Sequence, residues 1–290
     1  MTSSWREHPV GVVGLGLIGG SLGLDLRRAG LEVRALVHRE HTAERARQRG
    51  LADRVSTDSA VLEGCGLVVL ALPLDRLLEP PTGLRQALPR TAVVTDVGSV
   101  KGPVLQRWHH WHPRFVASHP MAGTAEAGVE AGLEGLFRGR PWVATPEADT
   151  DADALESVRQ LAELLGAHWL SCPAAAHDQA VALISHMPVL VSAALLQAAD
   201  RGSTSTGDPA RVAELVRQLA SSGFADTSRI GGGNPELGTL MARSNREAVL
   251  LALGSYRQQL QELEQLVEQQ HWGELQERLS RCQQLRPEFL

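Results

Sequence analysis

The feature that most constrains the fold of this chain is a glycine-rich turn, GLGLIG, at residues 14–19. It follows the apolar run Val10–Val13 and opens a segment with helical spacing, Ile18–Ala29. In such a strand–turn–helix unit the first glycine permits the tight turn, the second lets the backbone approach a pyrophosphate, and the third lets the helix pack on the strand. The helix start adds free N–H groups and partial positive charge. A dinucleotide-binding loop is therefore predicted, formed by Gly14, Leu15, Gly16, Leu17, Ile18 and Gly19.

Further apolar runs alternate with polar or helix-forming segments through the first part of the chain. This alternation predicts an α/β Rossmann domain, a doubly wound parallel sheet with helices on both faces. The runs are Val33–Val37, Leu67–Leu72, Ala92–Thr95, Phe115–Ser118, Trp142–Thr145 and His168–Cys172.

After Pro173 the composition becomes helical, with no convincing strand. The predicted helices are Ala174–Ala199, Pro209–Ser221, Pro235–Leu266 and Trp272–Gln284. We therefore expect a dinucleotide-binding domain at residues 1–172 and an all-α domain at residues 173–290. Leucines recur at helical spacing between Gln258 and Leu285, and such a stripe fits internal packing or pairing with a second subunit.

Bulk composition excludes several classes of protein. A formal net charge of −5 is unlike a nucleic-acid binder, which needs excess basic residues. The first nine residues lack the apolar core of a signal peptide, and no stretch approaches about 20 uninterrupted apolar residues. Three widely spaced cysteines without a CxxC pair are typical of reduced, structural thiols. A cytoplasmic enzyme is expected.

The end of the second predicted strand indicates which dinucleotide is bound. An NAD enzyme usually places an acid there, whereas a basic residue accommodates a 2′-phosphate. This chain has His38 and Arg39 at that point, with Thr42 close behind, and Glu40 comes late. Arg39 can donate charge-assisted hydrogen bonds to a phosphate, although a solvated arginine would be neutral toward the choice. NADP is therefore the predicted cofactor, and Leu72 and Pro73 are further expected contacts.

Two segments just beyond predicted strands carry candidate chemistry, TDVGSVK at residues 95–101 and SHPMAGT at residues 118–124. Ligands bind at the carboxyl edge of a doubly wound sheet, which places His119 beside the nicotinamide. Neutral His119 could take a hydroxyl proton while a hydride leaves the same carbon. Ser99 could orient the imidazole or the substrate oxygen, or it could simply cap the next helix.

The helical domain adds two candidate substrate-binding residues, His186 and Arg229. His186 could face the cleft or be a satisfied histidine between helices. Arg229 precedes a glycine run and could clamp a carboxylate with its guanidinium fork. The sequence HHWH at residues 109–112 suggests a metal cluster at first sight, but neighbouring histidines point apart and no acid accompanies them. No metal site is expected.

Together these segments resemble the prephenate and arogenate dehydrogenases of tyrosine biosynthesis, and most of all the arogenate dehydrogenases of cyanobacteria. The resemblance covers nearly the whole chain. It is carried by GLGLIGGSL at 14–22, TDVGSVK at 95–101, SHPMAGT at 118–124, HDQAVALISHMPV at 177–189 and SSGFADTSRIGGGNPELG at 221–238.

The resemblance implies oxidative decarboxylation of a cyclohexadienol that carries a ring carboxylate. In that reaction His119 would accept the ring hydroxyl proton, Ser99 would hold His119 and the hydroxyl, and Arg229 would bind a carboxylate. His186 would line the cleft between the domains. The family forms homodimers through the helical domain, which favours the subunit-pairing interpretation of the leucine stripe.

Two departures bear on the substrate. Prephenate-using relatives typically carry an acid right after HPxxGT, where this chain has Ala125, and often a second histidine in SHxPH, where it has Val189. Losing a cationic partner fits an ammonium-bearing side chain, so arogenate is favoured and prephenate is the alternative.

The sequence argues against two other protein classes. A β-hydroxyacid dehydrogenase or imine reductase typically uses a helical-domain lysine, and this chain has none after Pro173. A redox-sensing binding protein would need a partner surface or a DNA-binding element, against which the net acidity counts.

Overall fold

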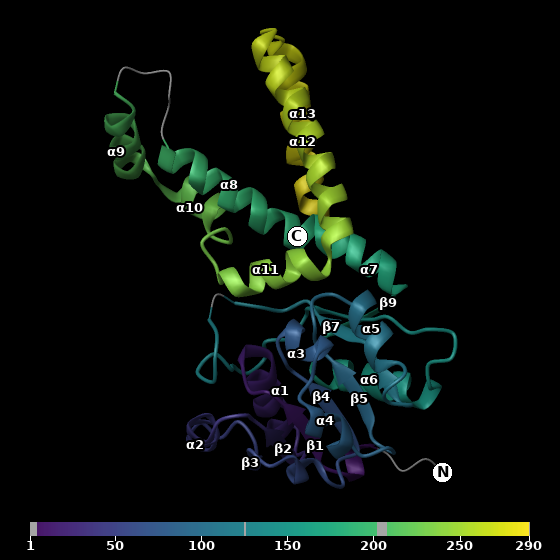
Figure 1. Ribbon diagram of the computed structural model, residues 1–290. Helices are drawn as coiled ribbons and strands as arrows, with labels where there is room; N and C mark the ends of the chain where they lie inside the picture. The colour runs from purple at the N-terminus through teal and green to yellow at the C-terminus, as the bar shows by residue number, and fades with distance from the viewer. Residues whose placement is uncertain (1–4, 125, 202–207, 290) are drawn as a thin grey trace.

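The computed structural model describes residues 5–124, 126–201 and 208–289. Two parts of different architecture follow each other along the chain. An α/β part forms one end of the molecule, and the helices from α8 onward stand above it (Figure 1). The switch from strands to helices at residue 173 follows the change in sequence pattern.

The main sheet has six parallel strands in the order β3-β2-β1-β4-β5-β6. The chain runs outward in one direction from β1 and then in the other from β4, so the strand order reverses between these two strands. Ligands of doubly wound sheets bind in the crevice at that reversal. The strands are β1 (Val10–Val13), β2 (Val33–Leu36), β3 (Arg54–Ser56), β4 (Leu67–Leu70), β5 (Val93–Asp96) and β6 (Phe115–Val116).

Helices cover both faces of this sheet. Alternate residues of β1 enter different cores, with Val10 and Val12 in one cluster and Val13 in the other. Such two-sided burial explains why the strands read as continuous apolar runs. The helices are α1 (Leu17–Arg28), α2 (Glu40–Gln48), α3 (Leu74–Leu78), α4 (Thr82–Ala87), α5 (Gly102–Trp108) and α6 (Ala152–Leu164), with 3₁₀ turns at Trp5–Glu7 and Ser59–Leu62.

Three late strands form a separate small sheet, β7 (Ser118–Pro120), β8 (Pro141–Ala144) and β9 (His168–Ser171). The sequence pattern had suggested one strand at 115–118 and a single parallel sheet. Instead, the chain changes partner at Ala117, whose carbonyl accepts a hydrogen bond from the Thr145 amide at 3.0 Å. Strand β7 then pairs with β8 in antiparallel fashion, while β8 and β9 are parallel.

The helical part begins with a nearly continuous rod. It consists of α7 (Ala174–Val181), a π-helical turn (Ala182–His186) and α8 (Met187–Arg201). The predicted helix at 235–266 is broken at Asn245, which has φ −121° and ψ 36°. A short helix at 222–228 was not predicted. The remaining elements are α9 (Pro209–Leu219), α10 (Ser222–Ser228), α11 (Pro235–Ser244), α12 (Arg246–Glu268), α13 (Trp272–Leu285) and a 3₁₀ turn at Arg286–Glu288.

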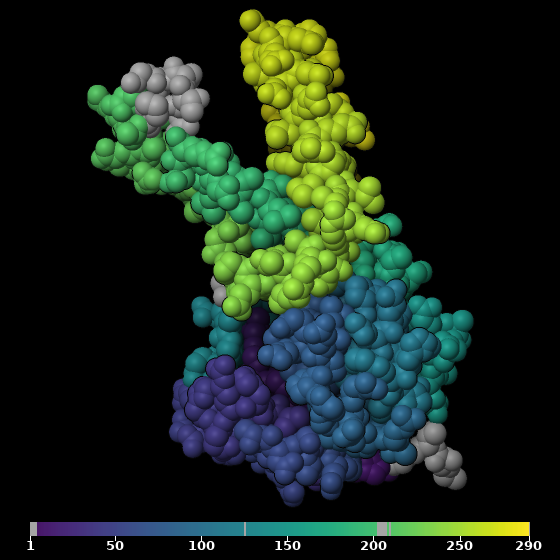
Figure 2. All heavy atoms as spheres, in the orientation of Figure 1, coloured from purple at the N-terminus to yellow at the C-terminus, as the bar shows by residue number. Residues whose placement is uncertain are grey.

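The helical part leaves much apolar surface uncovered. Helices α12 and α13 project from the body of the molecule as an arm (Figure 2). Their leucine stripe is divided: Leu263, Leu266 and Leu275 are half-buried, whereas Leu260 and Leu279 are 52% and 56% exposed. Other exposed apolar residues of this part include Leu183, Ile184, Leu237, Leu250 and Leu251.

The rod at Ala174–Arg201 is long and apolar enough to cross a membrane, judged by length and composition alone, with a mean hydropathy of 1.8. Its polar residues interrupt the apolar run. His177, Asp178 and His186 are buried and form hydrogen bonds to other parts of the protein. The rod therefore packs as an element of the domain junction.

Candidate active site

The glycine loop after β1 has the shape that a pyrophosphate requires. Gly14 has φ +92°, and a Cβ there would lie 2.4 Å from the Ala71 carbonyl oxygen. A Cβ on Gly19 would lie 1.9 Å from the Gly14 oxygen, so the third glycine permits close packing of helix on strand. Around Gly16, in contrast, nothing lies within 4 Å of the Cβ position. The loop is tight on the protein side and open on the side where a phosphate would approach.

The other residues predicted to contact the cofactor lie in this loop or near it. Leu15 is buried, whereas Leu17, Ile18 and Leu72 are partly exposed and Pro73 is exposed. Residues 72 and 73 come within three positions of the end of β4, the strand beside β1, so they lie at the same edge of the sheet as the loop. Their contact with a cofactor remains a prediction.

The residues predicted to choose the dinucleotide lie at the end of β2. His38 and Arg39 are exposed, and Arg39 is the N-cap residue that directly precedes α2. The acid that follows is engaged elsewhere, because the Glu40 carboxylate pairs with Arg47 at 3.0 Å. Within the described part of the chain, Arg39 has no ion-pair partner, and the Thr42 hydroxyl is bonded only to the neighbouring His41 ring at 3.5 Å. This edge is basic and free to receive an anion.

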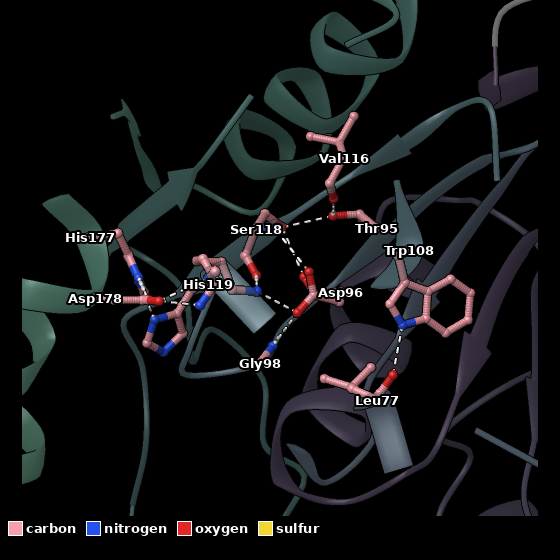
Figure 3. A network of polar contacts seen from close by, with 12 residues as sticks. Leu77, Thr95, Asp96, Gly98, Trp108, Val116, Ser118, His119, His177 and Asp178 are labelled. Atoms are coloured by element: carbon pink, nitrogen blue, oxygen red, sulfur yellow. Dashed lines mark hydrogen bonds and ion pairs between the residues drawn. The ribbon is translucent and has the colours of Figure 1, made fainter. Parts of the chain in front are cut away.

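A buried ion pair within the segment TDVGSVK, between Asp96 and Lys101, also holds the start of the segment SHPMAGT through Ser118. Figure 3 shows the contacts between Asp96 and Ser118. Lys101 is the only lysine in the sequence and its side chain is 0% exposed. Its ammonium pairs with the Asp96 carboxylate and donates to the Ser118 carbonyl at 2.6 Å. The same carboxylate accepts from the Ser118 and Gly98 amides at 3.1 and 2.8 Å. One carboxylate thus fixes the loop after β5 and the start of β7.

His119 follows Ser118 directly, which brings its ring to this edge of the sheet. The residue as a whole is half-buried, and Nδ1 of its ring lies 3.0 Å from Nε2 of His177 in α7 (Figure 3). The two rings meet edge to face, with centroids 5.2 Å apart. On its other side His177 Nδ1 lies 2.8 Å from the Asp178 carboxylate.

The Asp178 carboxylate ties the helical part to the α/β part. It accepts hydrogen bonds from the Lys101 and Gly102 amides at 2.7 and 2.8 Å. Burial alone would raise the pKa of Asp178, but the hydrogen bonds from His177 and the two amides outweigh burial and lower it. Asp178 is therefore an ionised acceptor.

His119 is uncharged at neutral pH. Burial of the ring, followed by the positive charge of Lys101, lowers the pKa of His119 well below 6.5. A neutral imidazole is the form that can accept a proton, so the environment prepares His119 for general base chemistry.

His186 is held by a second hydrogen-bond chain. Asn245 Nδ2 donates to the Asp178 carbonyl at 2.7 Å and lies 3.2 Å from His186 Nδ1. Because an amide nitrogen only donates, Nδ1 of His186 accepts and Nε2 carries the hydrogen. That Nε2 is buried and has no partner in the described structure. Burial lowers the pKa of His186 to about 4, so the ring is neutral.

Within the described residues, neither Ser99 nor Arg229 forms a hydrogen bond with His119. Ser99 is partly exposed, and the hydrogen-bond partner of the His119 ring is His177 instead. Arg229 is exposed at the end of α10, with no ion pair in the described part. Their roles remain predictions. Sequence reasoning noted His177 and Asp178 only as neighbours of His186, because nothing local reveals a contact across 58 positions.

The histidines at 109–112 serve local contacts. His109 lies 3.2 Å from Asp149, and His112 Nε2 lies 3.1 Å from the Pro89 carbonyl. Among the described residues, no three histidine, cysteine or acidic side chains gather as metal ligands would.

A doubly wound sheet, an open glycine loop at its switch point and an uncharged histidine at the same edge define a nicotinamide-nucleotide oxidoreductase. Two family models match this chain. The nucleotide-binding domain of prephenate dehydrogenase matches residues 22–171, and its dimerization domain matches residues 173–281. The chain belongs to the prephenate dehydrogenase family.

Individual relatives agree with this assignment. The crystal structure of Synechocystis arogenate dehydrogenase is 43% identical, with a TM-score of 0.82 over 97% of this chain and 100% of that one. Prephenate dehydrogenase of Aquifex aeolicus, in complex with hydroxyphenyl propionate and NAD⁺, is 29% identical, with a TM-score of 0.88 over 97% and 98%. A cyclohexadienyl dehydrogenase from Zymomonas mobilis is 29% identical over 96% of this chain and 94% of its own length.

Proposed function

We propose that this protein is an NADP-dependent arogenate dehydrogenase, which converts arogenate to tyrosine in the cytoplasm. The observation that carries the proposal is the neutral His119 at the edge of the sheet that holds the glycine loop. The 43% identity to Synechocystis arogenate dehydrogenase supports the substrate, compared with 28–29% for the prephenate dehydrogenases of Bacillus subtilis and Aquifex aeolicus.

In the proposed reaction, Nε2 of His119 takes the proton from the ring hydroxyl. The hydride on the same carbon leaves for the cofactor, whose nicotinamide supplies the acceptor. The bond from the ring to its carboxylate then breaks, carbon dioxide departs, and the electron pair makes the ring aromatic. The proton on His119 returns to the phenolate oxygen, so the step needs no further co-reactant. Loss of carbon dioxide and gain of aromaticity drive the reaction.

Six residues would position the reactants. Ser99 lies in the loop after β5 and would hold the substrate hydroxyl toward His119. His186 offers a buried N–H without a partner, and an unsatisfied buried donor costs about 1–3 kcal/mol until a ligand accepts from it. A substrate carboxylate would supply that acceptor, and Arg229 would clamp a carboxylate as well. Arg39, with His38 and Thr42, would hold the 2′-phosphate.

The preference for arogenate depends on two positions. Ala125 lies outside the described residues. Val189 is partly buried and faces Gly238 of α11, where an added Cβ would lie 3.5 Å from the valine. Because an apolar side chain replaces a potential cation there, the site fits the ammonium-bearing side chain of arogenate better than a keto acid.

The proposal includes a homodimer. We assign residues 1–172 to the cofactor domain and residues 173–290 to the dimerisation domain. Exposed leucines on α8, α11 and α12 would be covered by a second copy, as the dimerization-domain family of this part suggests.

The direct test is reduction of NADP⁺ and NAD⁺, followed at 340 nm, with arogenate and prephenate side by side. Turnover of arogenate with NADP⁺ is expected to exceed the other three combinations. Preferential turnover of prephenate would overturn the substrate, and preferential use of NAD⁺ would overturn the role of Arg39. Inactivity with both substrates would overturn the proposed function.

A further inference from the structure

We infer that His177 and Asp178 are positioning residues that fix which nitrogen of His119 carries the proton. The inference rests on the proposed role of His119 as the base. It is drawn from the contacts that join α7 of the helical domain to β7 and to the start of α5.

The direction of the chain of hydrogen bonds is set at Asp178. An ionised carboxylate only accepts, and this one already receives the amides of Lys101 and Gly102. In the 2.8 Å contact with His177 Nδ1, the histidine must therefore donate. Nδ1 of His177 carries a hydrogen.

The direction of this hydrogen bond then sets the direction of the next one, between His177 and His119. A neutral histidine ring that carries its hydrogen on Nδ1, as His177 would, has only a lone pair on Nε2. In the 3.0 Å contact, Nδ1 of His119 must donate to that lone pair. Nε2 of His119 is thereby left without a hydrogen, and this is the nitrogen that can take the proton of a substrate hydroxyl. A reversed chain would place a hydrogen on Nε2 and remove the base.

The same contacts make the base depend on how the two domains meet. Asp178 belongs to the helical domain, but both amides that hold its carboxylate belong to the α/β domain. At Gly102 a Cβ would lie only 3.1 Å from the carboxylate oxygen, so glycine permits the close approach. Asn245 holds the carbonyl of Asp178 from the other side. If the two domains separated, His119 would no longer be held in the tautomer that carries its hydrogen on Nδ1.

The inference can be tested without substrate. In protein labelled with ¹⁵N-histidine, long-range ¹H–¹⁵N correlations show which ring nitrogen bears the hydrogen. At neutral pH, His119 and His177 are both expected as the Nδ1–H tautomer, and in His177→Phe the His119 signals should move toward the Nε2–H form. An Nε2–H tautomer of His119 in the unaltered protein would overturn the inference.

Kinetics of two variants separate positioning from packing. His177→Phe removes the acceptor, and kcat should fall about 100-fold, within the range for a misdirected general base. His177→Gln offers an amide oxygen near the position of Nε2 and should recover most of that loss. The Kd for NADP⁺, measured by titration calorimetry, should not change in either variant.

The pH profile gives a readout that a purely structural role would not move. Loss of the acceptor destabilises protonated His119, so the acid limb of kcat/KM should shift to lower pH in His177→Phe. Lys101 and His186 also face His119, and both stay unchanged in this variant. His112→Gln is the matched control, because His112 is a buried histidine that bonds only to main chain; it should affect stability and leave the profile unmoved.

The outcomes distinguish the inference from the proposed function. If the unaltered protein turns over neither arogenate nor prephenate, the proposed function fails, while the tautomer measurement still decides the inference. If it turns over and His177→Phe matches it in rate and profile, the inference fails and the function stands.

Discussion

The two domains differ in how completely they bury their apolar residues. In the α/β domain, β1 and β4 are buried along their whole length, and cores lie on both faces of the sheet. In the helical domain the buried apolar cluster consists of Ala182, Val249 and Ala252, among the residues described. Many of its leucines are exposed.

The two domains are therefore stabilised in different ways. The α/β domain encloses its own core and presents the reaction edge on a rigid sheet. The helical domain takes part of its stability from surfaces outside itself, through contacts of α7 with the α/β domain and through the copy that would cover its leucines. The candidate site lies where the self-contained domain meets the dependent one.

The largest expected effect is on catalytic activity at the site where the two domains meet. His119→Asn should reduce kcat by about 10²–10⁴-fold, because it removes the general base from the edge of the α/β domain. Binding of NADP⁺ should persist, since the glycine loop is untouched; calorimetric titration would measure this. Turnover near that of the unaltered enzyme would remove His119 from the chemistry.

A matched pair of leucines tests the contrast in burial directly. Leu67 in β4 is 0% exposed and Leu251 in α12 is 71% exposed. Leu67→Ala should lower the free energy of unfolding by about 2–5 kcal/mol at any protein concentration, through lost burial and a cavity. Leu251→Ala should instead weaken association, seen by sedimentation at several concentrations. Equal effects on unfolding with no change in association would contradict the contrast.

The buried histidine of the helical domain gives stability a pH dependence. The pKa of His186 is about 4 in the folded protein, below its ordinary value of 6.5, so the unfolded chain binds more protons between these values. Stability should therefore fall as the pH drops from about 6.5 to about 4. In His186→Gln that slope should be smaller, as urea unfolding at a series of pH values would show. If the slope of stability against pH did not change in this variant, a group other than His186 would be responsible for it.

The smallest expected effect concerns the cofactor edge of the α/β domain. Arg39→Ala should weaken NADP⁺ binding about tenfold and leave NAD⁺ unchanged, because one charge-assisted hydrogen bond to the 2′-phosphate is lost at an exposed site. Arg257→Ala, an exposed arginine on α12, is the control and should affect neither. Equal weakening of both cofactors would mean that the 2′-phosphate is recognised elsewhere.

The same contrast explains what could be predicted from sequence. Strand β1 at Val10–Val13 and the helix after the glycine loop were found because both follow from local patterns of burial and turn residues. Strand β3 was missed because it is short and carries an exposed arginine. The change of sheet at Ala117 was missed because it depends on a partner strand more than 20 residues away.

In the helical domain the boundaries depend on long-range contacts. Asn245 interrupts an otherwise continuous helical pattern, and its side chain bonds to the Asp178 carbonyl, 67 positions away. The pairing of His119 with His177 is of the same kind. Residue types could nominate His119 as the base, but only the docking of two domains shows what holds its ring.

Lys101 has a practical consequence for chemical work on this enzyme. Because it is the only lysine and is fully buried, reagents that acylate or cross-link side-chain amines will find no accessible target in the folded protein. For the same reason, the folded protein cannot be attached to a solid support through a lysine side chain. The rate at which a small acylating reagent labels Lys101 would instead measure how often the enzyme opens, with the modified Lys101 peptide as the record of each opening.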